Sequence, residues 1–75
     1  MTLDALPIGS FAIITQVGGE GELHNRLLEM GLIPGTRVKA AKVAPLGDPL
    51  EIFLRGYSLT IRKEDAAQIQ VEVTE

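Results

Sequence analysis

Side chains that carry chemistry are scarce in this chain of 75 residues. There is one histidine, His24, there is no cysteine, and the only serines are Ser10 and Ser58. An active site needs several reactive groups that converge on one point. Neither serine lies in the pattern of a nucleophile elbow, and one histidine gives no spacing from which a Ser-His-Asp triad could be argued. The sequence therefore predicts that the chain is not an enzyme.

A metal site is the other chemistry to consider. Glu20, Glu22 and His24 could lie on one side near the start of a helix, and their oxygen and nitrogen atoms are ligands that Fe²⁺ tolerates. Flexible carboxylates beside glycines make a poorly preorganised site, and no thiolate is available. We interpret these residues as a solvated helix face and predict neither a metal site nor a cofactor.

Contact with a partner is the remaining kind of function. Leu46 stands between Pro45 and Gly47 at a loop tip, where an apolar side chain has little core to reach. It either folds back as a plug or docks on a partner, and a proline-stiffened loop with one apolar tip favours docking. Phe53 is predicted to point outward, and it either lies against the helix or a loop or belongs to a partner surface. The partner-binding hypothesis names five residues: Arg26, Met30, Leu46, Asp48 and Phe53.

The charge balance argues against nucleic acid as that partner. The formal net charge is −3 and the pI about 5.0, whereas binding through phosphates favours a basic stripe. Four basic residues are expected on the outer face of adjacent strands, with Phe53 as the only aromatic among them: Arg37, Lys39, Arg55 and Arg62. We interpret that face as a soluble surface of mixed sign, and we predict no nucleic-acid binding.

One helix is predicted over residues 22–30. Leu23, Leu27 and Met30 recur at the spacing of one helix face, and Glu22 with Arg26 forms a possible i,i+4 ion pair. Gly31 is expected at the left-handed position after the helix, with Leu27 and Leu32 in contact across the cap. Pro34 and Gly35 then fit the central positions of a type II turn.

Five short strands are predicted around this helix. Alternating or β-branched stretches occur at residues 10–17, 36–43, 50–55, 57–62 and 69–73. The alternation predicts two sets of residues that face the core: Leu50, Ile52 and Leu54 in one stretch, and Tyr57, Leu59 and Ile61 in the next. A change of parity near residues 40–41 indicates a bulge, and Gly56 marks a tight turn. Short helical turns are expected near Leu3 and over residues 63–67. So few residues must curl to bury one face, which predicts a mainly β fold, a small SH3-like or OB-like barrel.

The bulk properties fit one domain covering residues 1–75. Hydrophobic residues make up 45% of the chain, enough for a core. The N-terminus lacks the features of a signal peptide, and the longest apolar run is far below the ~20 residues that span a bilayer. We expect a cytoplasmic protein without direct membrane insertion.

The stretch R-L-L-E-M-G-L-I-P-G-T at residues 26–36 resembles the signature of the FeoA family, ferrous iron transport protein A. The resemblance continues through A-P-L-G-D-P-L at residues 44–50, G-Y-S-L-T-I-R at residues 56–62, and the N-terminal Leu3, Leu6, Pro7 and Gly9. It selects an SH3-like barrel of about five strands with one helix inserted between the first two. Its structural signature comprises Leu27, Gly31, Pro34, Gly35 and Gly56.

The resemblance also implies a function. It implies a cytoplasmic accessory that docks on the membrane ferrous iron transporter, ferrous iron transport protein B, from the cytosolic side. In one variant Arg26 would act as an arginine finger on the transporter's GTPase, although Glu22 and Glu29 are natural partners for it. The alternative is a small-barrel nucleic-acid or metal-responsive regulatory module, akin to the SH3-like domains of metal-dependent repressors.

Overall fold

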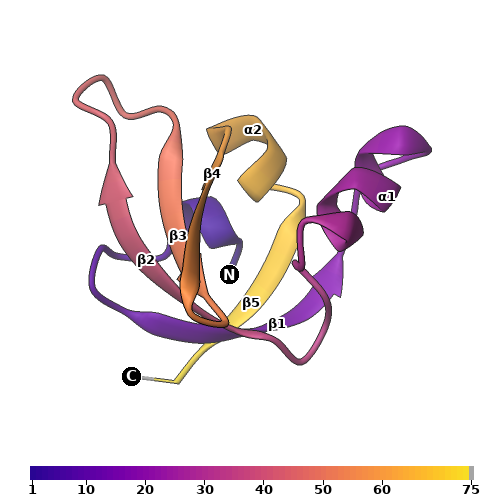
Figure 1. The fold of residues 1–75 in the computed structure, drawn as a ribbon, viewed down its shortest axis with the longest axis horizontal. Helices are drawn as coiled ribbons and strands as arrows, with labels where there is room; N and C mark the ends of the chain where they lie inside the picture. The colour runs from indigo at the N-terminus through magenta and orange to yellow at the C-terminus, as the bar shows by residue number, and fades with distance from the viewer. Residues whose placement is uncertain (75) are drawn as a thin grey trace.

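The computed structural model describes residues 1–74, and Figure 1 shows the path of the chain. Its elements are, in order, η1 (Leu3–Ala5), β1 (Phe11–Val17), α1 (Glu22–Glu29), β2 (Arg37–Val43), β3 (Leu50–Leu54), β4 (Tyr57–Ile61), α2 (Lys63–Ala66) and β5 (Ile69–Val73). The predicted five strands, with one helix between the first two, are confirmed. The helical turns expected near Leu3 and at residues 63–67 are η1 and α2. Within residues 1–74, no helix is long and apolar enough to cross a bilayer.

All five strands form one antiparallel sheet in the order β4-β3-β2-β1-β5. The sheet is strongly bent and encloses the core together with η1 and α2 (Figure 1). The register shifts between Ala40 and Lys42, which confirms the predicted bulge, and again between Ile14 and Gln16. Bulges bend a strand and increase its twist, so they help such short strands to curl.

The two edge strands of the sheet, β5 and β4, have different surroundings. The N-terminal residues cover β5, because Thr2 forms a bridge with Gln70 and the Val71 amide donates to the Met1 carbonyl at 2.8 Å. The opposite edge is β4, which continues from β3 through a two-residue turn. Arg55 and Gly56 both have positive φ in this turn, as a type I′ hairpin requires. The tight turn predicted at Gly56 is therefore confirmed.

Alternate residues of the strands fill the core. Leu50, Ile52 and Leu54 are buried as predicted, while Phe53 between them is 42% exposed. Tyr57 was expected to point inward with Leu59 and Ile61, and for Tyr57 the expectation is wrong. It lies on the edge strand beyond the reach of the core, 44% exposed, where its hydroxyl donates to the Met30 carbonyl at 2.7 Å.

The end of α1 is fixed by a complete Schellman motif. Gly31 adopts φ +96° directly after the C-cap residue Met30. The Leu32 amide donates to the Leu27 carbonyl at 3.2 Å, and the Gly31 amide donates to the Leu28 carbonyl at 3.0 Å. Leu27 and Leu32 are both fully buried, which confirms the predicted apolar pair across the cap.

The turn after α1 is also confirmed. The Thr36 amide donates to the Ile33 carbonyl at 3.0 Å, and Gly35 has φ +94°. Pro34 and Gly35 thus occupy the central positions of a type II turn. The chain then enters β2, so the direction from α1 back into the sheet is set by local backbone geometry.

Candidate functional site

The loop between β2 and β3 holds an apolar side chain out in the solvent. Leu46 at its tip is 97% exposed. The loop backbone is nevertheless hydrogen-bonded, since the Gly47 amide donates to the Ala44 carbonyl at 2.7 Å and the Ala44 amide donates to the Pro49 carbonyl at 3.0 Å. The first bond closes a β-turn with Pro45 at a position that favours proline. The loop backbone is therefore closed by its own hydrogen bonds, while the Leu46 side chain is exposed to solvent.

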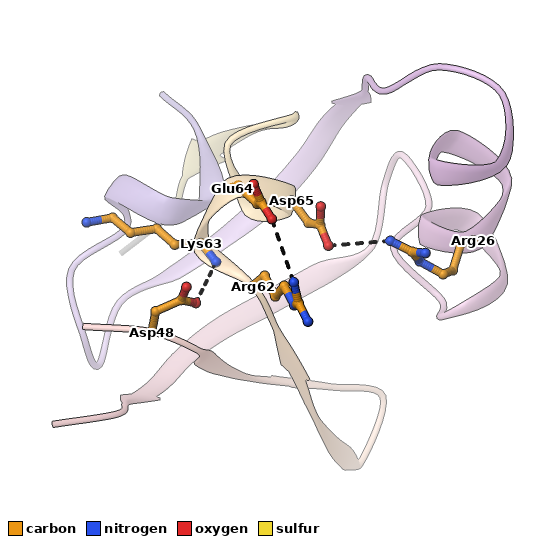
Figure 2. A network of polar contacts seen from close by, with 6 residues as sticks. All are labelled: Arg26, Asp48, Arg62, Lys63, Glu64 and Asp65. Carbon is orange, nitrogen blue, oxygen red and sulfur yellow. Dashed lines mark hydrogen bonds and ion pairs between the residues drawn. The ribbon is translucent and has the colours of Figure 1, made fainter. Parts of the chain in front are cut away.

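Asp48 attaches this loop to α2, as Figure 2 shows. Its Oδ1 accepts a hydrogen bond from the Lys63 backbone amide at 2.8 Å. Lys63 is the first residue of α2, so its amide has no partner within the helix, and a carboxylate is favourable at this end of a helix. The Asp48 side chain thus has a structural role, and its part in binding a partner stays a prediction.

Arg26 attaches α1 to α2 from the other side (Figure 2). Its Nη2 lies 3.6 Å from Asp65 Oδ2, with 61% of the Arg26 side chain and 19% of the Asp65 side chain exposed. The predicted pair of Arg26 with Glu22 is wrong, because the guanidinium reaches across to the more buried Asp65. Such an exposed pair contributes little energy, ~0–1 kcal/mol, so it orients α1 more than it stabilises the fold.

An open groove of about 430 Å³ lies beside this ion pair. Its lining comes from α1, the end of β4 and α2, and includes both Arg26 and Met30. The Arg62 and Glu64 side chains, 3.9 Å apart and largely exposed, lie at the same place. Three of the five predicted partner-binding residues therefore adjoin α2 or the groove beside it: Arg26, Met30 and Asp48. Leu46 lies at the tip of the loop that Asp48 attaches to α2.

Phe53 lies on a different part of the surface. It pairs in register with Lys39, which in turn pairs with Phe11. Phe11 and Phe53 line the same two hollows, which favours the surface position for Phe53 over packing against the helix or a loop. The sequence did not indicate that Phe11 points outward, since residues 11–14 are all apolar and show no alternation. Only the pairing of β1 with β2 reveals it.

His24 takes part in a local contact at the start of α1. Its Nδ1 lies 3.0 Å from the Gly18 carbonyl oxygen, so this nitrogen carries the proton and ties the helix to the end of β1. Within the described residues 1–74, no three His, Cys, Asp or Glu side chains are grouped so that they could hold a metal ion. The predicted absence of a metal site stays a prediction.

Comparison with known proteins assigns this chain to a family. A model of the FeoA domain matches residues 1–73. The chain belongs to the FeoA family. The resemblance noted in the sequence is thereby confirmed.

Relatives of this FeoA-family chain differ in length. A protein of Porphyromonas gingivalis, described as an Fe(2+) transport protein A/Fe(2+) transporter FeoB fusion protein, is 40% identical over 73 residues, which are 97% of this chain and 9% of the fusion. The chain thus spans less than a tenth of that relative. Iron(II) transport protein A of Clostridium thermocellum superposes with a TM-score of 0.94 at 40% identity, covering 99% of this chain and 46% of that one.

A further FeoA structure establishes the fold class. FeoA of Stenotrophomonas maltophilia, solved in complex with zinc, superposes with a TM-score of 0.84 at 26% identity, over 96% of this chain and 89% of that one. It is described as a prokaryotic SH3 domain protein, possibly acting as a bacterial ferrous iron transport activating factor. The predicted SH3-like class of the barrel is confirmed.

Proposed function

We propose that this chain is an accessory protein of ferrous iron transport that docks on a transporter of the FeoB type from its cytosolic side, without chemistry of its own. Its membership of the FeoA family supports the link to iron transport. The Porphyromonas gingivalis relative supports the choice of partner, because its name places protein A and FeoB in one polypeptide. Fusion keeps two interacting parts at a high effective concentration.

The exposure of Leu46 is the observation that carries the proposal. Transfer of this side chain from water into an interface contributes roughly 1.5–3 kcal/mol, and at 97% exposure nearly all of that gain is still available. The two hydrogen bonds across the loop and the bond from Asp48 to α2 restrict the loop before binding. Less conformational entropy is then lost when the loop docks.

Arg26 is given no catalytic part in this proposal. The guanidinium already contacts Asp65, and the contact has the geometry of a link between two helices. Stimulation of GTP hydrolysis by an arginine finger would require Arg26 to leave that partner.

The test replaces Leu46 by glutamate and Ile8, another exposed apolar residue, by glutamate as the matched control. Both variants should retain the free energy of unfolding within about 0.5 kcal/mol, as surface changes usually do. Leu46→Glu should lose capture of the FeoB-type transporter from native membranes and lower ferrous iron uptake in cells, whereas Ile8→Glu should retain both. If folded Leu46→Glu binds the transporter and supports uptake normally, the docking loop is excluded.

A further inference from the structure

Aromatic and cationic side chains lie together on the outer face of β1, β2 and β3, which form the lower and left part of the sheet in Figure 1. Phe11 pairs with Lys39 and Lys39 pairs with Phe53, so these three side chains form one row across the strands. Residues directly opposite each other on antiparallel strands point to the same face. The row therefore places two phenyl rings on either side of a lysine on a solvent-facing surface.

Cationic side chains gather at this row. The Arg37 guanidinium carbon lies 4.1 Å from the centre of the Phe11 ring, and Lys39 Nζ lies 5.4 Å from it. Arg55 lines the surface hollow that Phe11 and Arg37 also line, and its Nη2 donates to the buried Thr36 hydroxyl at 3.1 Å. Cation–π contact and this hydrogen bond restrict the guanidinium groups before any partner arrives.

The charge of the residues that line the two hollows on this face is positive, opposite in sign to the net charge of the chain. Three of the seven basic residues lie here, although the chain carries a net charge of −3. Among residues 1–74, no carboxylate lines either of the two hollows on this face, of about 190 and 330 Å³. The larger one is bounded by Phe11, the Lys39 side chain, Ala41 and Phe53, and suits an apolar side chain.

We propose that this aromatic–cationic face, formed by Phe11, Arg37, Lys39, Phe53 and Arg55, binds an acidic polypeptide segment that carries an apolar side chain. The apolar side chain enters the hollow between the two phenyl rings. Carboxylates beside it pair with the Lys39 ammonium and with the guanidinium groups of Arg37 and Arg55, whose planar forks match a carboxylate in bidentate geometry. The positive charge of this face favours binding of an acidic segment over binding of an uncharged or a basic segment.

A peptide fits this face better than single-stranded nucleic acid does. Base stacking needs an open aromatic face, and Arg37 already covers one face of Phe11. Phe53 would then be the main ring of this face left for base stacking, and a single phenyl ring offers little stacking area.

This surface extends the proposed docking function and does not depend on it. No residue of the loop 44–49 lines either hollow. The chain would then have two contact surfaces, the Leu46 loop beside α2 and the aromatic–cationic face. A module of this size could hold two partner segments at once.

The experiment uses the full chain labelled with ¹⁵N and three probes in NMR titrations. The probes are a short peptide with one leucine between glutamates, the same peptide with glutamines, and oligothymidylate. The glutamate peptide should shift the amide resonances of β1, β2 and β3 around Lys39. It should bind at least about threefold more tightly than the glutamine peptide, since each of three exposed ion pairs changes affinity by a factor of at least roughly 1.4. Added salt should weaken binding of the glutamate peptide, because salt screens exposed charges.

Substitutions separate this face from the rest of the surface. Lys39→Gln should weaken binding of the glutamate peptide roughly 1.4- to 5-fold, and Lys63→Gln, which removes the same charge on α2, should leave the binding unchanged. Arg37→Gln, a second and independent variant, should also weaken binding of the glutamate peptide. Leu46→Glu should bind the peptide like the wild type, so failure of this face and failure of the docking loop are distinguishable.

Three results would overturn the proposal. The first is the absence of shifts at millimolar concentrations of the glutamate peptide. The second is a shift map centred on Arg26 and Arg62 instead of Lys39, or equal losses for Lys39→Gln and Lys63→Gln. The third is tighter binding of oligothymidylate at this face than of the acidic peptide, which would assign the face to nucleic acid.

Discussion

Replacement of Gly31 by alanine should destabilise the protein by more than the left-handed backbone alone explains. Its φ of +96° costs an L-residue roughly 1–2 kcal/mol. A Cβ at this position would also lie 2.7 Å from the Tyr57 hydroxyl oxygen, so the hydroxyl would have to leave the Met30 carbonyl. Loss of that hydrogen bond adds ~0.5–1.5 kcal/mol, which gives a total of roughly 1.5–3.5 kcal/mol.

Two further variants isolate the two contributions. Gly35 has φ +94° and open space where a Cβ would lie, so Gly35→Ala should cost only the backbone part, ~1–2 kcal/mol. In Tyr57→Phe the hydroxyl is gone, and the next nearest atom to the added Cβ is Leu54 Cδ1 at 3.6 Å, an ordinary contact. Gly31→Ala should therefore cost less in the Tyr57→Phe background than in the wild type.

Urea unfolding followed by circular dichroism gives the free energy of each variant by linear extrapolation. The double-mutant cycle should show a sub-additive coupling of about 0.5–1.5 kcal/mol between Gly31→Ala and Tyr57→Phe. Equal costs of Gly31→Ala in both backgrounds would refute the contact with Tyr57. A cost below about 0.5 kcal/mol in the wild type would refute the left-handed position of Gly31 itself.

Two other outcomes are expected. Asp48→Ala should lower the free energy of unfolding by ~0.5–2 kcal/mol, because the Lys63 amide loses its acceptor, and Asp48→Asn should lose less in the same urea assay. Anaerobic calorimetry with Fe²⁺ should detect no stoichiometric binding at micromolar affinity to the isolated chain. Micromolar binding that disappears in His24→Ala would contradict this expectation.

The sequence predicts the parts of the fold that depend on local backbone geometry. Gly31 after the helix and Pro34-Gly35 before β2 each need a particular φ that few residues adopt, and both positions are as predicted. The alternation of Leu50, Ile52 and Leu54 likewise fixes which face of β3 is buried. These signals lie within a few residues of one another along the chain.

The parts that the sequence missed depend on distant residues. Arg26 pairs with Asp65, which is far away in the sequence, instead of the Glu22 one turn away. Tyr57 reaches the end of α1 because β4 is an edge strand, and strand order cannot be obtained from alternation. Phe11 points outward for the same reason, since only its pairing with Lys39 settles which face it shares.

The bulge in β2 links the fold to the charge of its outer face. Lys39 and Lys42 are three residues apart, so in a regular strand they would point to opposite faces. The register shift between Ala40 and Lys42 leaves Ala41 as the extra residue. Lys39 then pairs with Phe53 and Lys42 with Glu51, two residues that alternate on the same face of β3. The bulge accommodates Ala41 and thus keeps both lysines in solvent and a second charge out of the core. Deletion of Ala41 would leave Lys39 and Lys42 two residues apart, on the same face of a regular strand, so it should remove the bulge and its bend without turning either lysine inward.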